Sequence, residues 1–125
     1  MSVNITSISF QDNYVNVVLE GVRTGFLTQY LTIHDQAFAV AEEHDCPRIL
    51  IDASRVDFEP DIVLERSLAI DLAHRCHEKH RVAVVLPSGS SVQKAGEKFE
   101  STAHSRGLSV RAFTHHETAM TWLLS

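Results

Sequence analysis

The chain has 125 residues, of which 44% are hydrophobic and 22% charged, and this composition fits one compact domain over residues 1–125 with a single core. Its formal net charge of -5, from 11 basic and 16 acidic residues, argues against nucleic acid as a partner, because phosphate backbones are bound by clustered Lys and Arg. No apolar run approaches the ~20 residues that span a bilayer, and the start MSVNITSISF lacks the basic and apolar regions of a secretion signal. We therefore expect a cytoplasmic protein without a membrane span, in which Cys46 and Cys76 are free thiols.

The first half of the chain predicts a β-hairpin, a helix and a buried strand. Residues 8–21 place apolar and β-branched residues on both sides of a Gln-Asp-Asn turn, as a hairpin does. Over 26–44, apolar residues recur at three- and four-residue steps, which predicts a helix with one buried stripe, although Thr32 could instead cap a shorter helix. The stripe comprises Phe26, Leu27, Tyr30, Leu31, His34, Ala37, Phe38 and Ala41. The apolar run RILIDAS, residues 48–54, predicts a central strand that is buried on both faces.

The next segments predict a second and a third helix around another buried strand. Pro60 favours the first turn of a helix over residues 62–76. The run RVAVVLP, residues 81–87, is a second two-sided strand. Ser88 is placed to cap the following helix, which Gly107 ends in the left-handed conformation.

The chain closes with a strand over residues 108–113 and a short helix over 115–124. The predicted order is therefore ββαβαβαβα, an α/β fold with a mostly parallel sheet, flanking helices and right-handed crossovers. Because ligands of such sheets favour the carboxyl ends of the strands, the loops 52–61 and 87–91 are the first candidates for a binding site.

The pattern resembles the STAS/SpoIIAA-like group of small bacterial proteins, which includes sulfate-transporter tails and anti-sigma factor antagonists. The resemblance lies in the opening hairpin, ILIDASRV, RVAVVLP, KFESTAHSRGLSVRAF and the terminal ETAMTWLL, and it covers nearly the whole chain in element order. It implies a SpoIIAA-like fold and a non-catalytic protein that binds partners or itself.

The antagonists of this group carry an Asp-x-Ser-x-Val segment followed by an Asp-Ser-Ser-Gly helix start whose serine is phosphorylated by a partner kinase. This chain keeps the first part as Asp52-Ala53-Ser54-Arg55-Val56, and the second part is replaced by Glu59-Pro60-Asp61-Ile62. An acid at the helix start could imitate a phosphoserine, because negative charge is favoured there. We prefer the simpler hypothesis that Pro60 and Asp61 begin a helix.

Two further groups of reactive side chains favour ordinary structural roles. His74, Cys76, His77 and His80 gather around one helix end but do not supply the four convergent ligands of a structural zinc site, so no metal is predicted. Residues 88–91, Ser-Gly-Ser-Ser, lack the features of a nucleophile elbow or a nucleotide-binding loop, and we predict a helix cap with at most a general affinity for anions.

The leading hypothesis is a non-catalytic binding module without a cofactor, which contacts a protein partner or a second copy of itself. Asp52 is expected to accept backbone N–H groups from a turn at Ser54 and Arg55. The predicted binding residues all lie in the two candidate loops, and they are Asp52, Ser54, Arg55, Asp57, Glu59, Asp61, Ser88 and Ser90.

Two alternatives remain. The first is a carrier of a small hydrophobic ligand or lipid, with a pocket between the first two helices lined by Phe26, Tyr30, Phe38 and Ile62. The second is a hydrolase or isomerase that uses Asp52 with a nearby histidine such as His34. It requires a deep polar pocket that holds both side chains.

Overall fold

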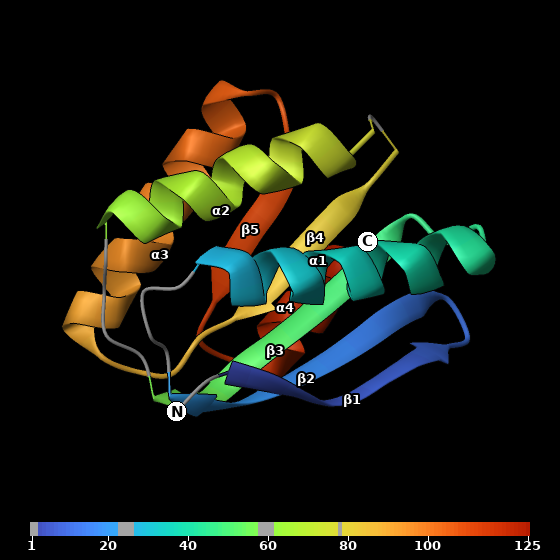
Figure 1. Cartoon of the computed structure of the whole chain (residues 1–125), viewed down its shortest axis with the longest axis horizontal. Helices are drawn as coiled ribbons and strands as arrows, with labels where there is room; N and C mark the ends of the chain where they lie inside the picture. Colours follow the sequence, from blue (N-terminus) through green and yellow to red (C-terminus); the bar gives the residue numbers. More distant parts are fainter. Residues whose placement is uncertain (1–2, 23–26, 58–61, 78) are drawn as a thin grey trace.

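The computed structural model describes residues 3–22, 27–57, 62–77 and 79–125. They form the predicted order of elements, namely β1 (Val3–Gln11), β2 (Tyr14–Val22), α1 (Leu27–Glu43), β3 (Arg48–Asp57), α2 (Ile62–Arg75), β4 (Arg81–Val85), α3 (Ser90–Ser105), β5 (Ser109–Phe113) and α4 (His116–Leu123). The strands make one sheet in the order β1-β2-β3-β4-β5, and only the β1–β2 pair is antiparallel (Figure 1). The predicted α/β fold is thus confirmed.

Three helices cover one face of the sheet, and the fourth covers the other. Side chains of α1, α2 and α3 share one buried cluster with β2 and β3, whereas Ala119 and Leu123 of α4 form a second cluster with Leu50, Val85 and Phe113. Figure 1 shows α1 in front of the sheet and α4 behind it. Each parallel strand is the spatial neighbour of the next, so successive crossovers move in one direction and leave their helices on one face.

A row of branched apolar side chains crosses the sheet beneath α1, α2 and α3. Val15 pairs with Ile49, Ile49 pairs with Val82, and Val82 pairs with Val110, and all four side chains are inaccessible to solvent. Branched residues pack well on a pleated sheet. This row explains why the apolar runs 48–54 and 81–87 form interior strands.

Two local predictions were wrong. Residues 54–57 continue β3 rather than forming a loop, because Arg55, Val56 and Asp57 pair with β2. Ser88 does not cap α3; the helix begins after Gly89, whose φ of 146° suits glycine, and no side chain caps it. Gly107, with φ of 76°, follows the end of the same helix in the left-handed conformation, as predicted.

Within the described residues, no helix has the length and apolar character that crossing a membrane requires.

Candidate functional site

The predicted Asp52–Asp57 segment lies where β3 parts from β4. The β3–β4 pairing ends at Asp52 and Val85, whereas β3 stays paired with β2 as far as Asp57. Along β2 the register advances from Val18 to Glu20, while β3 advances from Asp52 to Arg55, so β3 holds one extra residue. This is a β-bulge, which bends a strand and redirects its side chains.

Asp52 stabilises that bulge with its side chain. Its Oδ1 accepts the backbone N–H of Ser54 at 3.0 Å and the Ser54 hydroxyl at 2.6 Å. Asp52 therefore accepts the backbone hydrogen bond that the sequence predicted, although the donor lies in a strand rather than in a turn. The Ser54 hydroxyl is committed to a carboxylate, and among the described residues no histidine contacts it.

The other predicted binding residues of this segment that the structure describes, Arg55 and Asp57, are charged and exposed to solvent. Arg55 donates to Glu20 Oε1 at 3.1 Å, but both side chains are largely exposed, and such pairs contribute little to stability. Asp57 is exposed as well. Glu59 and Asp61 lie outside the described residues.

Ser88 lies between β4 and α3, Ser90 is the first residue of α3, and both are exposed. Because β3 and β4 are parallel neighbours, their carboxyl ends lie at the same edge of the sheet. The described residues of the two predicted loops therefore share this edge. No direct contact between them defines a common site in the described part of the chain.

A cavity of about 70 Å³ lies between the sheet and the layer of α1, α2 and α3. Its walls are mainly apolar, and its lining residues include Leu19, Ile51, Leu68, Leu72, Val84, Leu86, Gly96 and Phe99. Tyr30, His34 and Glu65 bring polar groups to it. His34 and Glu65, at 5% and 4% exposed, are the buried polar or charged residues among those that the structure describes.

His34 is held by a chain of charged groups that joins α1 to α2. Its Nδ1 lies 2.7 Å from Asp71 Oδ2, and the same oxygen accepts Arg75 Nε at 2.7 Å. Arg75 also donates to the Asp35 carboxylate and to the Leu31 carbonyl. We call His34, Asp71, Arg75 and Asp35 the α1–α2 relay.

The pKa of Asp71 depends on its burial and on its two hydrogen-bond partners, His34 and Arg75. Burial alone raises the pKa of Asp71, but hydrogen bonds from His34 and Arg75 outweigh it, so the pKa lies below its ordinary value. Asp71 is therefore ionised near neutral pH. A carboxylate only accepts hydrogen bonds, so the His34 Nδ1 carries the proton of this contact.

The carrier and enzyme alternatives find little support in this cavity. Tyr30 lines it, but Phe38 lies elsewhere, edge-on to the His80 ring at 5.3 Å, and Phe26 and the Ile62 side chain lie outside the described residues. The volume is about half that of a cavity that holds one benzene, which is too small for a lipid chain. Asp52 follows Ile51 in the pleat and so faces the α4 side, away from His34.

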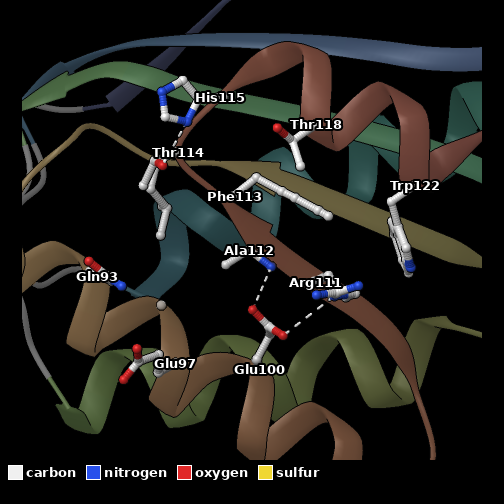
Figure 2. A pocket seen from close by; sticks show the side chains of 12 residues that line it. Gln93, Glu97, Glu100, Arg111, Ala112, Phe113, Thr114, His115, Thr118 and Trp122 are labelled. Carbon is white, nitrogen blue, oxygen red and sulfur yellow. Dashed lines mark hydrogen bonds and ion pairs between the residues drawn. The ribbon is translucent and has the colours of Figure 1, made fainter.

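An open groove of about 400 Å³ runs along β5, between α3 and α4 (Figure 2). Glu100 reaches from α3 to β5, where Oε2 accepts the Ala112 backbone N–H at 3.0 Å and Oε1 lies 3.8 Å from Arg111 Nε. The Arg111 guanidinium lies over the rings of Phe113 and Trp122, 5.4 and 5.9 Å from their centroids. No sequence pattern predicts this groove, because its residues come from α3, β5, α4 and the segments next to them.

Two of the histidines near the end of α2, His77 and His80, contact each other. The backbone N–H of His77 donates to His80 Nδ1 at 2.8 Å, and burial, followed by the nearby His77 and Lys79, lowers the pKa of His80. Among the described residues, no three or more His, Cys, Asp or Glu side chains are grouped as a metal site requires.

Two residues of α2 at the cavity and its neighbouring hydrogen bonds were not predicted from the sequence. Asp71 was not singled out, although it stands four residues before Arg75, a spacing that puts both side chains on one helix face. Glu65 was also missed, because an acid in the first turn of a helix is usually solvated.

Comparison with known proteins supports the fold. No protein-family model matches the chain, and no curated protein matches it. Among solved structures, the crystal structure of an anti-sigma factor antagonist from Mycobacterium paratuberculosis matches with a TM-score of 0.64 and 15% sequence identity, over 99% of this chain and 96% of that chain. At this identity the likeness extends to the fold alone. The chain thus has the SpoIIAA-like (STAS) fold of that antagonist, as the resemblance in its sequence implied.

Proposed function

We propose that the protein is a non-catalytic regulatory module that binds a protein partner, or a second copy of itself, through the end of β3 and the outer face of α2. We call this face the β3–α2 surface, and its described residues are Ser54, Arg55, Asp57, Val63 and Arg66, all exposed. The match to an anti-sigma factor antagonist over nearly the whole chain supports this class of function.

The observation that carries the proposal is the exposure of Val63. Its side chain is 76% exposed in the first turn of α2, whereas the other large apolar side chain found exposed among the described residues, Leu124, is 40% exposed. Arg55 and Asp57 lie just upstream, at the end of β3. An apolar contact with a charged rim is the usual composition of a transient protein interface.

The chemistry of Ser54 also favours binding over catalysis. A nucleophilic serine is usually activated by a histidine that removes its proton, whereas the Ser54 hydroxyl donates to the Asp52 carboxylate at 2.6 Å and contacts no histidine among the described residues. A phosphate on Ser54 would bring like charges together at this position. Phosphorylation of Ser54 would therefore open the bulge and alter the same surface.

The proposal is tested by affinity capture from native lysate with quantitative mass spectrometry. Val63→Asp is compared with Leu124→Asp, which changes the other exposed apolar residue, and Arg55→Glu is compared with Arg106→Glu at the end of α3. We expect Val63→Asp and Arg55→Glu to lose a partner that both controls retain, with unchanged melting temperatures. Light scattering of the same variants reports whether that partner is a second copy. Identical partner profiles and masses for all four variants would refute the surface.

A further inference from the structure

The two edge strands of the sheet differ in what lies against their backbone. β5 ends the sheet on one side, and there the Glu100 carboxylate accepts the Ala112 backbone N–H at 3.0 Å. β1 ends the sheet on the other side (Figure 1), and no strand of the described residues pairs with its outer side. An edge strand presents a row of N–H and C=O groups to which another strand can bond. β1 is therefore the edge that is open to a partner.

β1 also lacks the charges that usually protect an edge. Its sequence VNITSISFQ contains no acidic or basic residue, whereas each of the other four strands contains at least one. Natural edge strands are commonly protected by charged side chains, lysine above all. Because the chain has a formal net charge of -5, an uncharged strand lets two copies meet without placing like charges opposite each other.

The regular part of β1 is Ser7–Gln11. The register with β2 shifts between Ile5 and Ser7, as at a β-bulge, and from Ser7 onward each residue pairs with β2 in turn. Ile8 and Phe10 are half-buried and pack against the core beneath α1. Side chains alternate along a strand, so Ser7, Ser9 and Gln11 face the opposite side, where Gln11 Nε2 donates to Ser9 Oγ at 2.7 Å.

This segment is complementary to itself. When two copies of Ser7–Gln11 pair antiparallel about Ser9, Ile8 of each copy lies beside Phe10 of the other. On the opposite face the two Ser9 side chains meet, and each Ser7 lies opposite a Gln11, so polar residues meet uncharged polar residues. A centre at Ser9 pairs all five residues and reaches neither the register shift nor the turn after Gln11. Such a contact is two-fold symmetric and closed, as in most homodimers.

We propose that β1 binds β1 of a second copy of this chain, by antiparallel pairing of Ser7–Gln11 about Ser9, which joins the two sheets into one. This surface is separate from the β3–α2 surface and does not depend on the proposed function.

The proposal is tested on the full chain by light scattering over a concentration series. We expect the wild-type mass to rise from monomer toward dimer. Ser9→Lys puts two like charges opposite each other, so we expect the dissociation constant to increase by about tenfold. Ser109→Lys, at an exposed serine of β5, is the matched control and is expected to associate as the wild type does. A wild type that stays monomeric, or a Ser9→Lys variant that associates equally well, would overturn the proposal.

Oxidative cross-linking tests the pairing itself. Opposite residues of antiparallel strands have Cα atoms about 4.5–5.5 Å apart, within the range of about 4.4–6.8 Å that a disulfide bridges. We expect Ser9→Cys to give a disulfide-linked dimer under a mild oxidant. Ser7→Cys is the register control, because its two copies would lie four residues apart along the strand, about 13 Å, and Ser109→Cys is the control on β5. The wild type reports any linkage through Cys46 or Cys76. Cross-linking of Ser7→Cys as fast as Ser9→Cys would contradict this register.

A further variant separates this inference from the proposed function. Val63→Asp changes the β3–α2 surface and is expected to leave the β1 dimer intact, with the same mass series as the wild type. If Val63→Asp dissociated the dimer and Ser9→Lys did not, the second copy would bind through the β3–α2 surface, and the pairing of β1 would be refuted while the proposed function would stand.

Discussion

Asp71 of α2 connects this helix to α1 through its contact with His34. One carboxylate oxygen serves both His34 and Arg75, and the side chains of these two partners are 7% and 22% exposed. Removing the shared acceptor leaves two poorly solvated donors without their partner, and unsatisfied groups of this kind are costly.

We expect Asp71→Asn to lower the free energy of unfolding by about 2 kcal/mol at pH 7. The pKa of Asp71 is lowered in the folded state, so its contribution to stability is present above the unfolded pKa and is lost as the pH falls through the folded pKa. Urea unfolding at pH 7 and near pH 3 should therefore show a smaller acid-induced loss in the variant than in the wild type. Asp45→Asn, at the exposed pair with Lys79, is the control and is expected to change little.

Cys76 is a second residue whose environment predicts a measurable property. Burial raises the pKa of its thiol to about 11, from an ordinary value of 9.0. The reactive thiolate at pH 8 is therefore about a hundredfold scarcer than for an ordinary thiol. We expect iodoacetamide to label Cys76 slowly in the native protein and rapidly in urea, as followed by mass spectrometry. Equal rates in the two states would contradict the buried thiol.

The bulge in β3 shows how an element can differ from its local sequence pattern. Asp-x-Ser followed by a charged residue predicts a turn, and the expected loop started at Asp52. Pairing with β2 carries the backbone on to Asp57, and the turn-forming side chains stabilise a bulge instead. The local sequence could predict the hydrogen bond of Asp52, but only the neighbouring strand decides that the segment is extended.

We expect Asp52→Ala to lower the free energy of unfolding by about 1–2 kcal/mol, because the Ser54 N–H and hydroxyl lose their acceptor. Ser54→Ala removes only the hydroxyl bond and is expected to cost less, about 0.5–1 kcal/mol. Asp57→Ala is the control in the same strand, since its side chain is exposed. Equal stability of all three variants and the wild type in urea would show that the bulge does not depend on Asp52.

The start of α3 is also set by a backbone conformation, the positive φ of Gly89, rather than by a capping side chain. Ser88 satisfies the usual preference for a capping residue, yet Gly89 directly precedes the helix with a φ of 146°. A serine cannot adopt this conformation without strain, whereas glycine can. The position of the helix could be predicted from its apolar spacing, but the path of the chain out of β4 could not.

At the scale of the whole molecule, β5 is an exposed edge of the sheet. The Glu100 carboxylate accepts the outward N–H of Ala112, so it occupies a position at which another strand would pair. Open edges are the usual starting points of association between sheets.

We therefore expect Glu100→Ala to increase self-association relative to the wild type, with a rise in mass at high concentration in size-exclusion chromatography with light scattering. Glu97→Ala, one turn earlier in α3 and on the same groove, is the matched control. Equal masses for the two variants across the concentration series would show that Glu100 does not protect the edge.

The global fold could be predicted from the sequence more completely than the polar groups that line the cavity. Runs such as RILIDAS and RVAVVLP reveal buried strands by their composition alone, and the all-buried row through Ile49 and Val82 confirms them. His34 and Glu65 carry no such signal, because spacing identifies the buried face of a helix but not which polar side chains meet across it. The described lining of the cavity comes from six elements, β2, α1, β3, α2, β4 and α3, and is a property of their packing.

The consecutive order of the strands has a consequence for folding. The hairpin of β1 and β2 can form first, and each later strand then joins the edge left by the previous one, as Ile49 joins Val15 and Val82 joins Ile49. No strand has to be inserted between two that are already paired. Each loop closure therefore joins two strands that are consecutive in the sequence, and the new strand pairing offsets its entropy cost. The sheet can therefore grow from its amino-terminal hairpin in the order in which a ribosome delivers it.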